Sequence, residues 1–389
     1  MMASSPRPRV LVLLGCFWPG NDSSGPNQSF KALATALSNQ FEFRLVARDR
    51  PTGPGQQAPA HAAEWVDLGF TRAHYCQIGA MGARGLKSLV NQTPHDVLWL
   101  NSVFDREFSL PALAMRRLGL IGDAPMVLSP RGEFGSGALG VKSTKKQVFL
   151  EAARRLKLWR GVTLHATSEA EARDMAAGVR GAAPIVIAPN IRLPIDAASF
   201  SASPDGALRL SFVGRIVPVK QLDYALNVLA RVRAQVEFNI YGPAEDAAYW
   251  ARCQELIAKL PANIRVIWHG ETSNDGVVAA MAKTDLFFLP TGGENFGHAI
   301  FEALSTGAPI LISDQTPWRR LAASKAGWDL PLAEMDPWVE TIDSFARLSE
   351  PQRSEYRQGA ASVARKWFAE SGAVEKSAQL LTACLRGAS

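Results

Sequence analysis

The sequence predicts an α/β protein made of two doubly wound, Rossmann-like domains. Three observations support this: short apolar runs alternate with helical patterns, the alternation stops at a polar stretch and then restarts, and 389 residues are enough for two domains. Such strands form parallel sheets that bind ligands beyond their carboxyl ends. We therefore expect two domains that face each other across a ligand-binding cleft.

The first domain is expected over residues 1–195. Its predicted strands are Arg9–Leu14, Phe43–Ala47, His95–Leu100, Pro125–Leu128, Thr163–Ala166 and Ile185–Ala188. Its predicted helices are Phe30–Leu37, Leu110–Leu118 and Glu169–Ala177. The basic and apolar N-terminus imitates a signal peptide, but a turn follows it instead of a cleavage site, so we favour a buried first strand.

A small, polar, turn-rich stretch at 196–206 is the expected linker, and the second domain is expected over 207–370. Its predicted strands are Leu208–Val213, Val236–Tyr241, Ile264–Trp268, Asp285–Pro290 and Pro309–Ser313. Its predicted helices are Leu222–Val232, Ala247–Lys259, Asp275–Ala282 and Gly297–Ser305. Residues Trp338–Leu385 are predicted to be helical throughout.

The composition excludes disordered and fibrous proteins, because 47% of the residues are hydrophobic and only 20% are charged. No apolar run approaches the roughly 18 residues of a membrane span. The four cysteines are far apart and have no metal-ligand spacing, which favours reduced thiols in a cytoplasmic protein.

The segment Lys142–Arg160 contains seven basic residues and one acidic residue. Its net charge of +6 equals the net charge of the whole chain. One interpretation is a domain helix that buries Phe149 and Leu156 beneath a solvated cationic face. The other is contact with anionic lipid head groups, or with a lipid-diphosphate acceptor, at the cytoplasmic membrane surface. No aromatic side chains interleave with the cations in the way that would indicate nucleic-acid binding.

The segment Leu289–Pro309 is the most informative part of the chain. A strand ends, two glycines follow, and a helix begins near Phe296-Gly297, so its unpaired amides and dipole can receive a phosphate. Glu294 lies at the entrance of this helix, and Glu302 is close enough to hydrogen-bond a sugar. The structural alternative makes Glu294 a helix-dipole partner and Glu302 a solvated residue.

A second loop, Gly214–Lys220, also joins a predicted strand to a predicted helix. Arg215 and Lys220 are the residue types that neutralise a diphosphate, although either alone could be a surface cation.

The combination of G-R-x-x-P-x-K (Gly214–Lys220) with E-x-F-G-x-x-x-x-E (Glu294–Glu302) resembles the family 4, or group 1, retaining glycosyltransferases of GT-B fold. The resemblance extends over nearly the whole chain. It includes Gly15, Gly25, Ser168, Pro189-Asn190, Tyr241-Gly242 and His269-Gly270.

This resemblance implies that Arg215 and Lys220 bind the donor diphosphate, Glu294 a hydroxyl of the transferred sugar, and Glu302 the ribose. It further implies a donor site that contains Gly214, Gly242, His269, Asn295, Phe296, Gly297 and His298. The acceptor would meet the N-terminal domain, near Gly15, Gly25, Asn101, Arg131 and Glu133. In this fold the last helix, here 371–389, packs back on the first domain, so we expect Trp367 and Phe368 to be packing residues.

The sequence also departs from the family. Asn101 stands where the family commonly has an active-site histidine, and an amide can hydrogen-bond a hydroxyl but cannot act as an acid or base. Arg131 and Glu133 could contact acceptor or phosphate, or could form a salt-bridged structural loop. No Asp-x-Asp or HExxH motif is present, and cations with a helix dipole can neutralise phosphate, so we expect neither a metal nor a cofactor.

The expected activity is transfer of a sugar, with retention of configuration, from a nucleotide-diphosphate sugar to a hydroxyl acceptor. The resemblance and the basic segment suggest a polyprenyl-linked or cell-surface saccharide as acceptor, and an enzyme that is cytoplasmic or peripheral on the membrane. The alternatives are a nucleotide-sugar epimerase of the same fold and a catalytically silent protein that binds sugar nucleotides.

Overall fold

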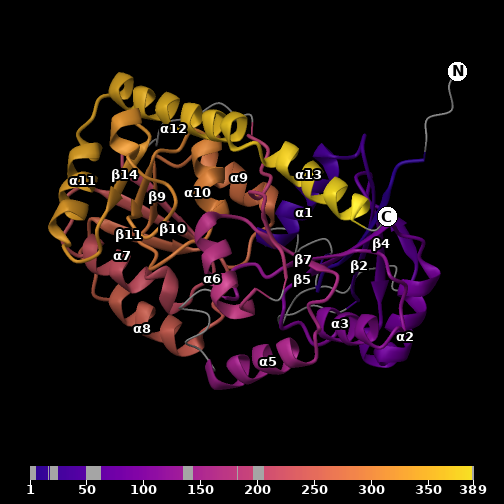
Figure 1. Ribbon diagram of the computed structural model, residues 1–389. Helices are drawn as coiled ribbons and strands as arrows, with labels where there is room; N and C mark the ends of the chain where they lie inside the picture. The colour runs from indigo at the N-terminus through magenta and orange to yellow at the C-terminus, as the bar shows by residue number, and fades with distance from the viewer. Residues whose placement is uncertain are drawn as a thin grey trace, which may run out of the picture. The chain divides into compact units, whose positions relative to one another are not determined.

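The computed structural model describes residues 6–15, 17, 25–49, 63–134, 143–181, 183–195 and 206–387 (Figure 1). The chain divides into two compact units: residues 1–192 together with 371–389, and residues 193–370. The linker expected at 196–206 lies outside the described residues, except for Gly206. Each unit contains one sheet with helices on both faces, so the α/β fold class is confirmed.

The first unit has an eight-stranded sheet in the order β3-β4-β2-β1-β5-β6-β7-β8. All neighbours are parallel except β3, which pairs with β4 in the antiparallel direction. The expected first strand is confirmed, and its residues 10–13 are buried because both faces of the sheet are covered. The strands are β1 (Arg9–Leu13), β2 (Glu42–Arg48), β3 (Trp65–Asp67), β4 (Arg72–Cys76), β5 (Val97–Asn101), β6 (Met126–Ser129), β7 (Val162–Ala166) and β8 (Ile185–Ile187).

Helices cover this sheet on both faces and create a separate apolar core on each. Alternate side chains of β1 divide between the cores: Val10 and Val12 belong to the core with α1 and α13, Leu11 and Leu13 to the other. Since α13 contributes Leu380 and Leu381, the C-terminal helix belongs to the N-terminal unit. The helices are α1 (Gly25–Ala36), α2 (Ile78–Gln92), α3 (Ser109–Arg117), α5 (Ser143–Arg155), α6 (Glu169–Val179) and α13 (Ala373–Arg386).

The second unit has a six-stranded parallel sheet in the order β11-β10-β9-β12-β13-β14. Its strands are β9 (Leu208–Val213), β10 (Val236–Tyr241), β11 (Ile264–Trp268), β12 (Leu286–Leu289), β13 (Ile310–Ser313) and β14 (Gly327–Leu330). The α-helices are α7 (Leu222–Leu229), α8 (Ala247–Ile257), α9 (Asn274–Ala282), α10 (His298–Ser305), α11 (Asp336–Ala346) and α12 (Glu350–Ser371), and 3-10 turns occupy Pro218–Lys220 and Leu321–Ser324. A search of the described helices for one long and apolar enough to span a membrane finds none.

Two features of the structure differ from what the sequence suggested. Leu156 is 60% exposed and follows the end of α5, so the interpretation that buries it beneath a cationic face is wrong on this point, whereas Phe149 does pack, edge-on to Phe104 at 5.6 Å. Trp367 is a packing residue as expected, but it contacts Phe296 of its own unit. In the N-terminal unit the structure also contains β3, β4 and α2, which the sequence did not predict.

Candidate functional site

The order of the strands shows where each sheet opens to a ligand. In the second unit β9 lies between β10 and β12. The chain therefore adds β10 and β11 on one side of β9 and later adds β12, β13 and β14 on the other side. The loops after β9 and β12 therefore diverge, and this topological switch point is where open α/β sheets bind ligands. In the first unit the equivalent point lies between β1 and β5. Gly214–Lys220 and Glu294 follow the strands of one switch point, and Gly15 and Asn101 those of the other.

Lys220 and Glu294 form an ion pair at the switch point of the second unit. Backbone contacts bring their loops together, since the Gly292 amide donates to the Val219 carbonyl at 2.7 Å. The Thr291 hydroxyl donates to the same carbonyl at 3.2 Å. With side chains only 18% and 13% exposed, the pair is partly shielded from water, which strengthens its interaction with a charged ligand.

Gly242 allows the loops after β9 and β10 to approach each other closely. Its φ is 140°, and a Cβ built on it would lie 2.0 Å from the Gly214 carbonyl oxygen. Only glycine fits such a contact with backbone. The tight approach fixes the start of the loop that leads to Lys220.

The N-terminus of α10 lies directly after the Glu294 loop. Gly297 precedes the helix with φ 79°, a left-handed conformation that favours glycine. Glu302, one turn into the helix, is 6% exposed, and Asn274 donates to its carboxylate at 3.5 Å. Glu302 is therefore not a solvated helical residue.

Phe296 anchors the loop with its ring and its carbonyl. The ring lies 4.8 Å from that of Trp367 and 5.6 Å from that of Trp318, whose indole N–H donates to the Phe296 carbonyl at 2.6 Å. Because this carbonyl already accepts a hydrogen bond, the amide groups that follow it are the better candidates for contact with a ligand.

The other residues predicted to bind the sugar-nucleotide donor lie in the same unit but do not contact the Lys220–Glu294 ion pair in the bonds described here. Arg215 is 60% exposed and pairs with Glu245 at 2.9 Å. The ring of His269 stacks on Tyr241 with centroids 4.4 Å apart. Asn295 is exposed, and His298 is half-buried with its ring edge-on to Phe296 at 5.0 Å.

In the first unit, Gly15 and Asn101 lie at the ends of the switch-point strands. A Cβ at Gly15 would meet the Arg48 guanidinium at 2.6 Å, and Arg48 Nε donates to the Gly15 carbonyl at 2.5 Å. Arg48 also pairs with Asp105 at 3.7 Å and with Glu107 at 3.2 Å. Sequence reasoning missed Arg48, which ends β2 beside β1. Gly25 is the first residue of α1.

Arg131 bridges two asparagines at the carboxyl ends of the strands. Its Nε and Nη2 donate to Asn101 Oδ1 at 3.1 and 2.9 Å, and its Nη1 donates to Asn190 Oδ1 at 2.8 Å. Arg131 has φ 57°, a strained conformation for a non-glycine residue. Burial lowers the pKa of Arg131 to about 10, so the guanidinium remains charged at neutral pH.

Glu133 stabilises the turn after β5. It accepts from the Ser102 hydroxyl at 2.5 Å and from the Val103 amide at 2.6 Å. These bonds, like those of Arg131, are made to neutral partners, and they hold both residues beside the end of β5.

His165 lies beneath Arg131 as a buried neutral base. Its Nε2 donates to the Ala188 carbonyl at 2.7 Å, and its Nδ1 accepts from Ser129, whose hydroxyl oxygen accepts from the Trp99 indole. Burial, reinforced by the charge of Arg131, lowers the pKa of His165 to about 4.

This histidine makes stability depend on pH. Between its ordinary pKa of 6.5 and about 4, the unfolded chain binds a proton that the folded protein does not. We therefore expect the contribution of His165 to the free energy of unfolding to be complete above pH 6.5 and to fall by about 3 kcal/mol as the pH decreases toward 4. Denaturant unfolding at several pH values in this range should give a free energy of unfolding that changes less with pH for His165→Gln than for the wild type. The same pH dependence in both proteins would contradict the assignment.

Within the ranges that the structure describes, no three His, Cys, Asp or Glu residues gather as they would around a metal ion. The cysteines Cys76, Cys253 and Cys384 are buried free thiols.

Comparison with solved structures shows the fold of the chain. Anabaena HepE, in complex with UDP and glucose, aligns over 97% of this chain and 100% of its own with a TM-score of 0.67 at 14% identity. Sucrose-phosphate synthase from Thermosynechococcus elongatus aligns over 97% and 100%, with a TM-score of 0.68 at 14% identity. The fold is therefore GT-B.

Two family models account for most of the chain. "Glycosyl transferase 4-like domain" matches residues 24–190, and "Glycosyl transferases group 1" matches residues 197–363. The protein belongs to the family 4, or group 1, glycosyltransferases.

Curated relatives match over part of their length. A GDP-mannose-dependent alpha-mannosyltransferase of Mycolicibacterium smegmatis is 32% identical over 31% of this chain and 29% of its own. A phosphatidyl-myo-inositol mannosyltransferase of Mycobacterium leprae is 28% identical over 40% of this chain and 41% of its own. The aligned part of the chain thus spans less than half the length of either relative.

Proposed function

We propose that the protein transfers a sugar, with retention of configuration, from a nucleotide-diphosphate sugar to a hydroxyl acceptor. The observation that carries this proposal is the Lys220–Glu294 ion pair, held at the switch point of the second unit just before the N-terminus of α10. A cation for phosphate, a carboxylate for a sugar hydroxyl and a helix dipole are the groups that a sugar nucleotide requires.

The donor is proposed to bind the second unit. As the sugar–phosphate bond breaks, negative charge increases on the diphosphate, and Lys220, the amides of Gly297 and His298, and Arg215 stabilise it. Arg215 must exchange its exposed partner Glu245 for the ligand, which costs little because exposed ion pairs are weak.

Other residues of that unit would fix the rest of the donor. Glu294 orients a hydroxyl of the transferred sugar, and Glu302 accepts from the ribose. Gly214 and Gly242 permit close backbone approach, while the stacked ring of His269 lies beside the base. Asn295 and Phe296 set the path of the loop.

The acceptor is proposed to bind the first unit, near Gly15, Gly25, Asn101, Arg131 and Glu133. Since Asn101 cannot take a proton, the departing phosphate oxygen takes the acceptor's proton on the same face of the sugar. We propose that this chemistry needs no metal, because cations and a helix dipole neutralise the leaving group. A lipid-linked or growing saccharide at the cytoplasmic face of the membrane is the proposed acceptor.

Ligand-induced stabilisation tests the donor site. Sugar nucleotides should raise the melting temperature by mass action, and GDP-mannose and UDP-glucose, which the names of a relative and a neighbour contain, are the first to test. Slow hydrolysis of the stabilising donor in EDTA, without acceptor, is the expected companion result. An isomerised sugar nucleotide would instead assign an epimerase, and binding without hydrolysis or transfer would assign a silent binding protein.

A further inference from the structure

Four large apolar side chains of the N-terminal unit project into solvent on and near α3 and α5. Leu118 is 71% exposed, Val148 65%, Leu156 60% and Leu120 40%. The other exposed large apolar residues of the described chain, Leu193, Val219 and Trp268, belong to the second unit. Isolated exposed leucines are ordinary, but a group of them on one surface indicates an interaction site.

The turns that carry the three leucines are held next to each other. Arg117, at the end of α3, donates from Nε to the Leu156 carbonyl at 2.9 Å. Asn91 of α2 donates to the Leu120 carbonyl at 3.1 Å. The leucines are therefore displayed on fixed turns that precede β6 and β7, at the amino ends of these strands, whereas the switch point lies at the carboxyl ends.

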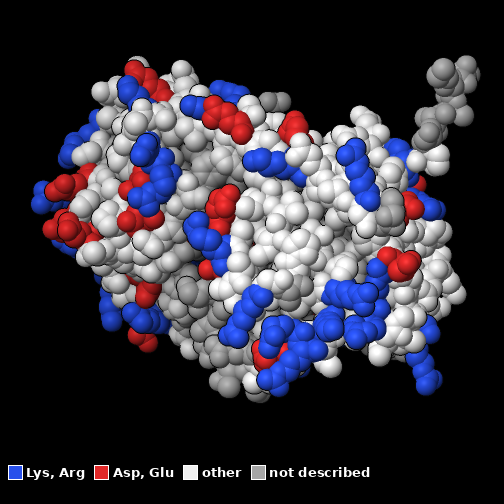
Figure 2. Space-filling view, in the orientation of Figure 1, with Lys and Arg blue, Asp and Glu red and all other residues white. Residues whose placement is uncertain are grey.

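Cations surround these apolar side chains, and we call the combined surface the α3–α5 surface. Figure 2 shows Lys and Arg side chains gathered over α5 and the end of α3, with little acidic surface between them. The cations are Arg116, Arg117, Arg154, Arg155, Lys157 and Arg160. The acidic side chains among them are Asp123 and Glu151, and Glu151 is bound by both Arg154 and Arg155.

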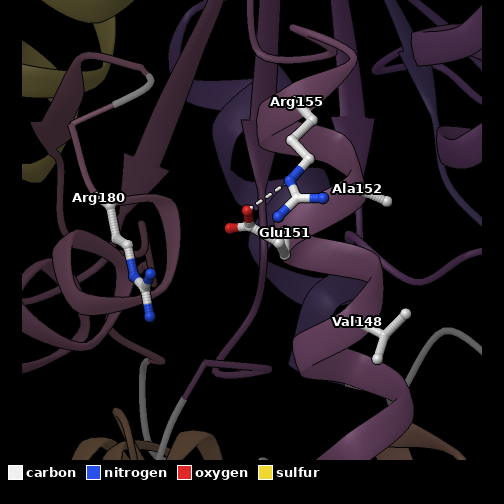
Figure 3. Close-up of a pocket in the computed structure, with 5 residues that line it drawn as sticks. All are labelled: Val148, Glu151, Ala152, Arg155 and Arg180. Carbon is white, nitrogen blue, oxygen red and sulfur yellow. Dashed lines mark hydrogen bonds and ion pairs between the residues drawn. The ribbon is translucent and has the colours of Figure 1, made fainter.

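A pocket of about 550 Å³ continues the α3–α5 surface along α5 (Figure 3). Val148, Glu151, Ala152 and Arg155 line it from α5, and Arg180 lines it from the end of α6. The guanidinium groups of Arg180 and of Arg155, which is paired with Glu151, therefore border this space beside the exposed Val148.

We propose that the α3–α5 surface docks on an anionic lipid bilayer, with Leu118, Leu120 and Leu156 inserted among the head groups and the cations in contact with lipid phosphates. The occupant follows from the combination of side chains: apolar residues gain by leaving water, and the surrounding cations match a negative surface. A nucleic acid would use the cations but leave the leucines in water. The proposal stands independently of the sugar-transfer activity.

Vesicle flotation tests the proposal with the full-length protein. We expect binding to vesicles of equal parts phosphatidylglycerol and phosphatidylcholine at low ionic strength, weaker binding as salt is added, and little binding to phosphatidylcholine alone. The variant Leu118→Ser/Leu156→Ser should reduce the partition coefficient about tenfold while keeping all cations. Arg154→Glu/Lys157→Glu should reduce it by at least as much.

Matched controls separate docking from folding and from catalysis. Lys259→Glu/Lys283→Glu makes the same total charge change at two exposed positions of the second unit and should bind vesicles like the wild type. Donor-induced stabilisation should be the same in every variant, so failure of the docking proposal and failure of the donor site are distinguishable. Absence of wild-type binding to anionic vesicles, or wild-type binding by the leucine variant, overturns the proposal. Light scattering that shows a dimer lost in the leucine variant would assign the surface to a second copy instead.

Discussion

Replacing Lys220 or Glu294 with alanine should reduce sugar transfer about a thousandfold or more while leaving the protein folded. Each change removes a group proposed to contact the donor and leaves its partner as a partly shielded, unpaired charge. Because both residues are proposed to act on the same bound donor, Lys220→Ala/Glu294→Ala should be little worse than either single variant. The measurement is kcat/KM with the donor identified by thermal shift, together with melting temperatures in its absence.

The second unit offers a matched control pair. Lys325 and Glu355 form another Lys–Glu ion pair, but their side chains are 57% and 54% exposed. Lys325→Ala and Glu355→Ala should change neither transfer nor stability appreciably, since exposed pairs contribute little. Near-normal turnover by Lys220→Ala would remove the basis for the donor-site assignment.

A single methyl group at Gly242 should destabilise the second unit by about 3 kcal/mol and impair donor binding. In Gly242→Ala the new Cβ would lie 2.0 Å from the Gly214 carbonyl oxygen, at φ 140°, and neither backbone segment can move without shifting a strand end. Denaturant unfolding of the variant and the wild type gives the difference directly.

Gly293→Ala is the appropriate control because it adds the same methyl group in the neighbouring loop. No heavy atom lies within 4 Å of a Cβ at this position. Its free energy of unfolding should remain within about 0.5 kcal/mol of the wild type. Equal stability of the two alanine variants would show that the close approach at Gly242 relaxes without cost.

Periodicity in the sequence was sufficient for most of the second unit. Runs rich in apolar residues, such as Leu208–Val213 and Val236–Tyr241, match the observed strands β9 and β10. No such run marks β4, whose sequence Arg72–Cys76 contains no Val, Ile or Leu and which lies beside the edge strand β3. Periodicity also failed for α2, which is interrupted by non-helical backbone at Gly82.

The sequence predicted those parts of the candidate site that lie in one local motif. It could not predict the contacts that arise only when the sheet brings separate strands together. Spacing placed Glu294 and Lys220 after separate strands, yet their ion pair depends on β9 and β12 being adjacent. The burial of Glu302 likewise depends on packing beyond its own helix. Arg48 carries no local motif, and its proximity to Gly15 follows only from the pairing of β1 with β2.

The way the chain is divided between the two units has a consequence for biosynthesis. The second unit is one continuous segment, 193–370, whereas the first needs α13, which follows that segment, to cover Phe30 and Leu33. During translation the second unit can therefore complete its core while the first still lacks its final helix. The N-terminal half, although synthesised first, is the last to become complete.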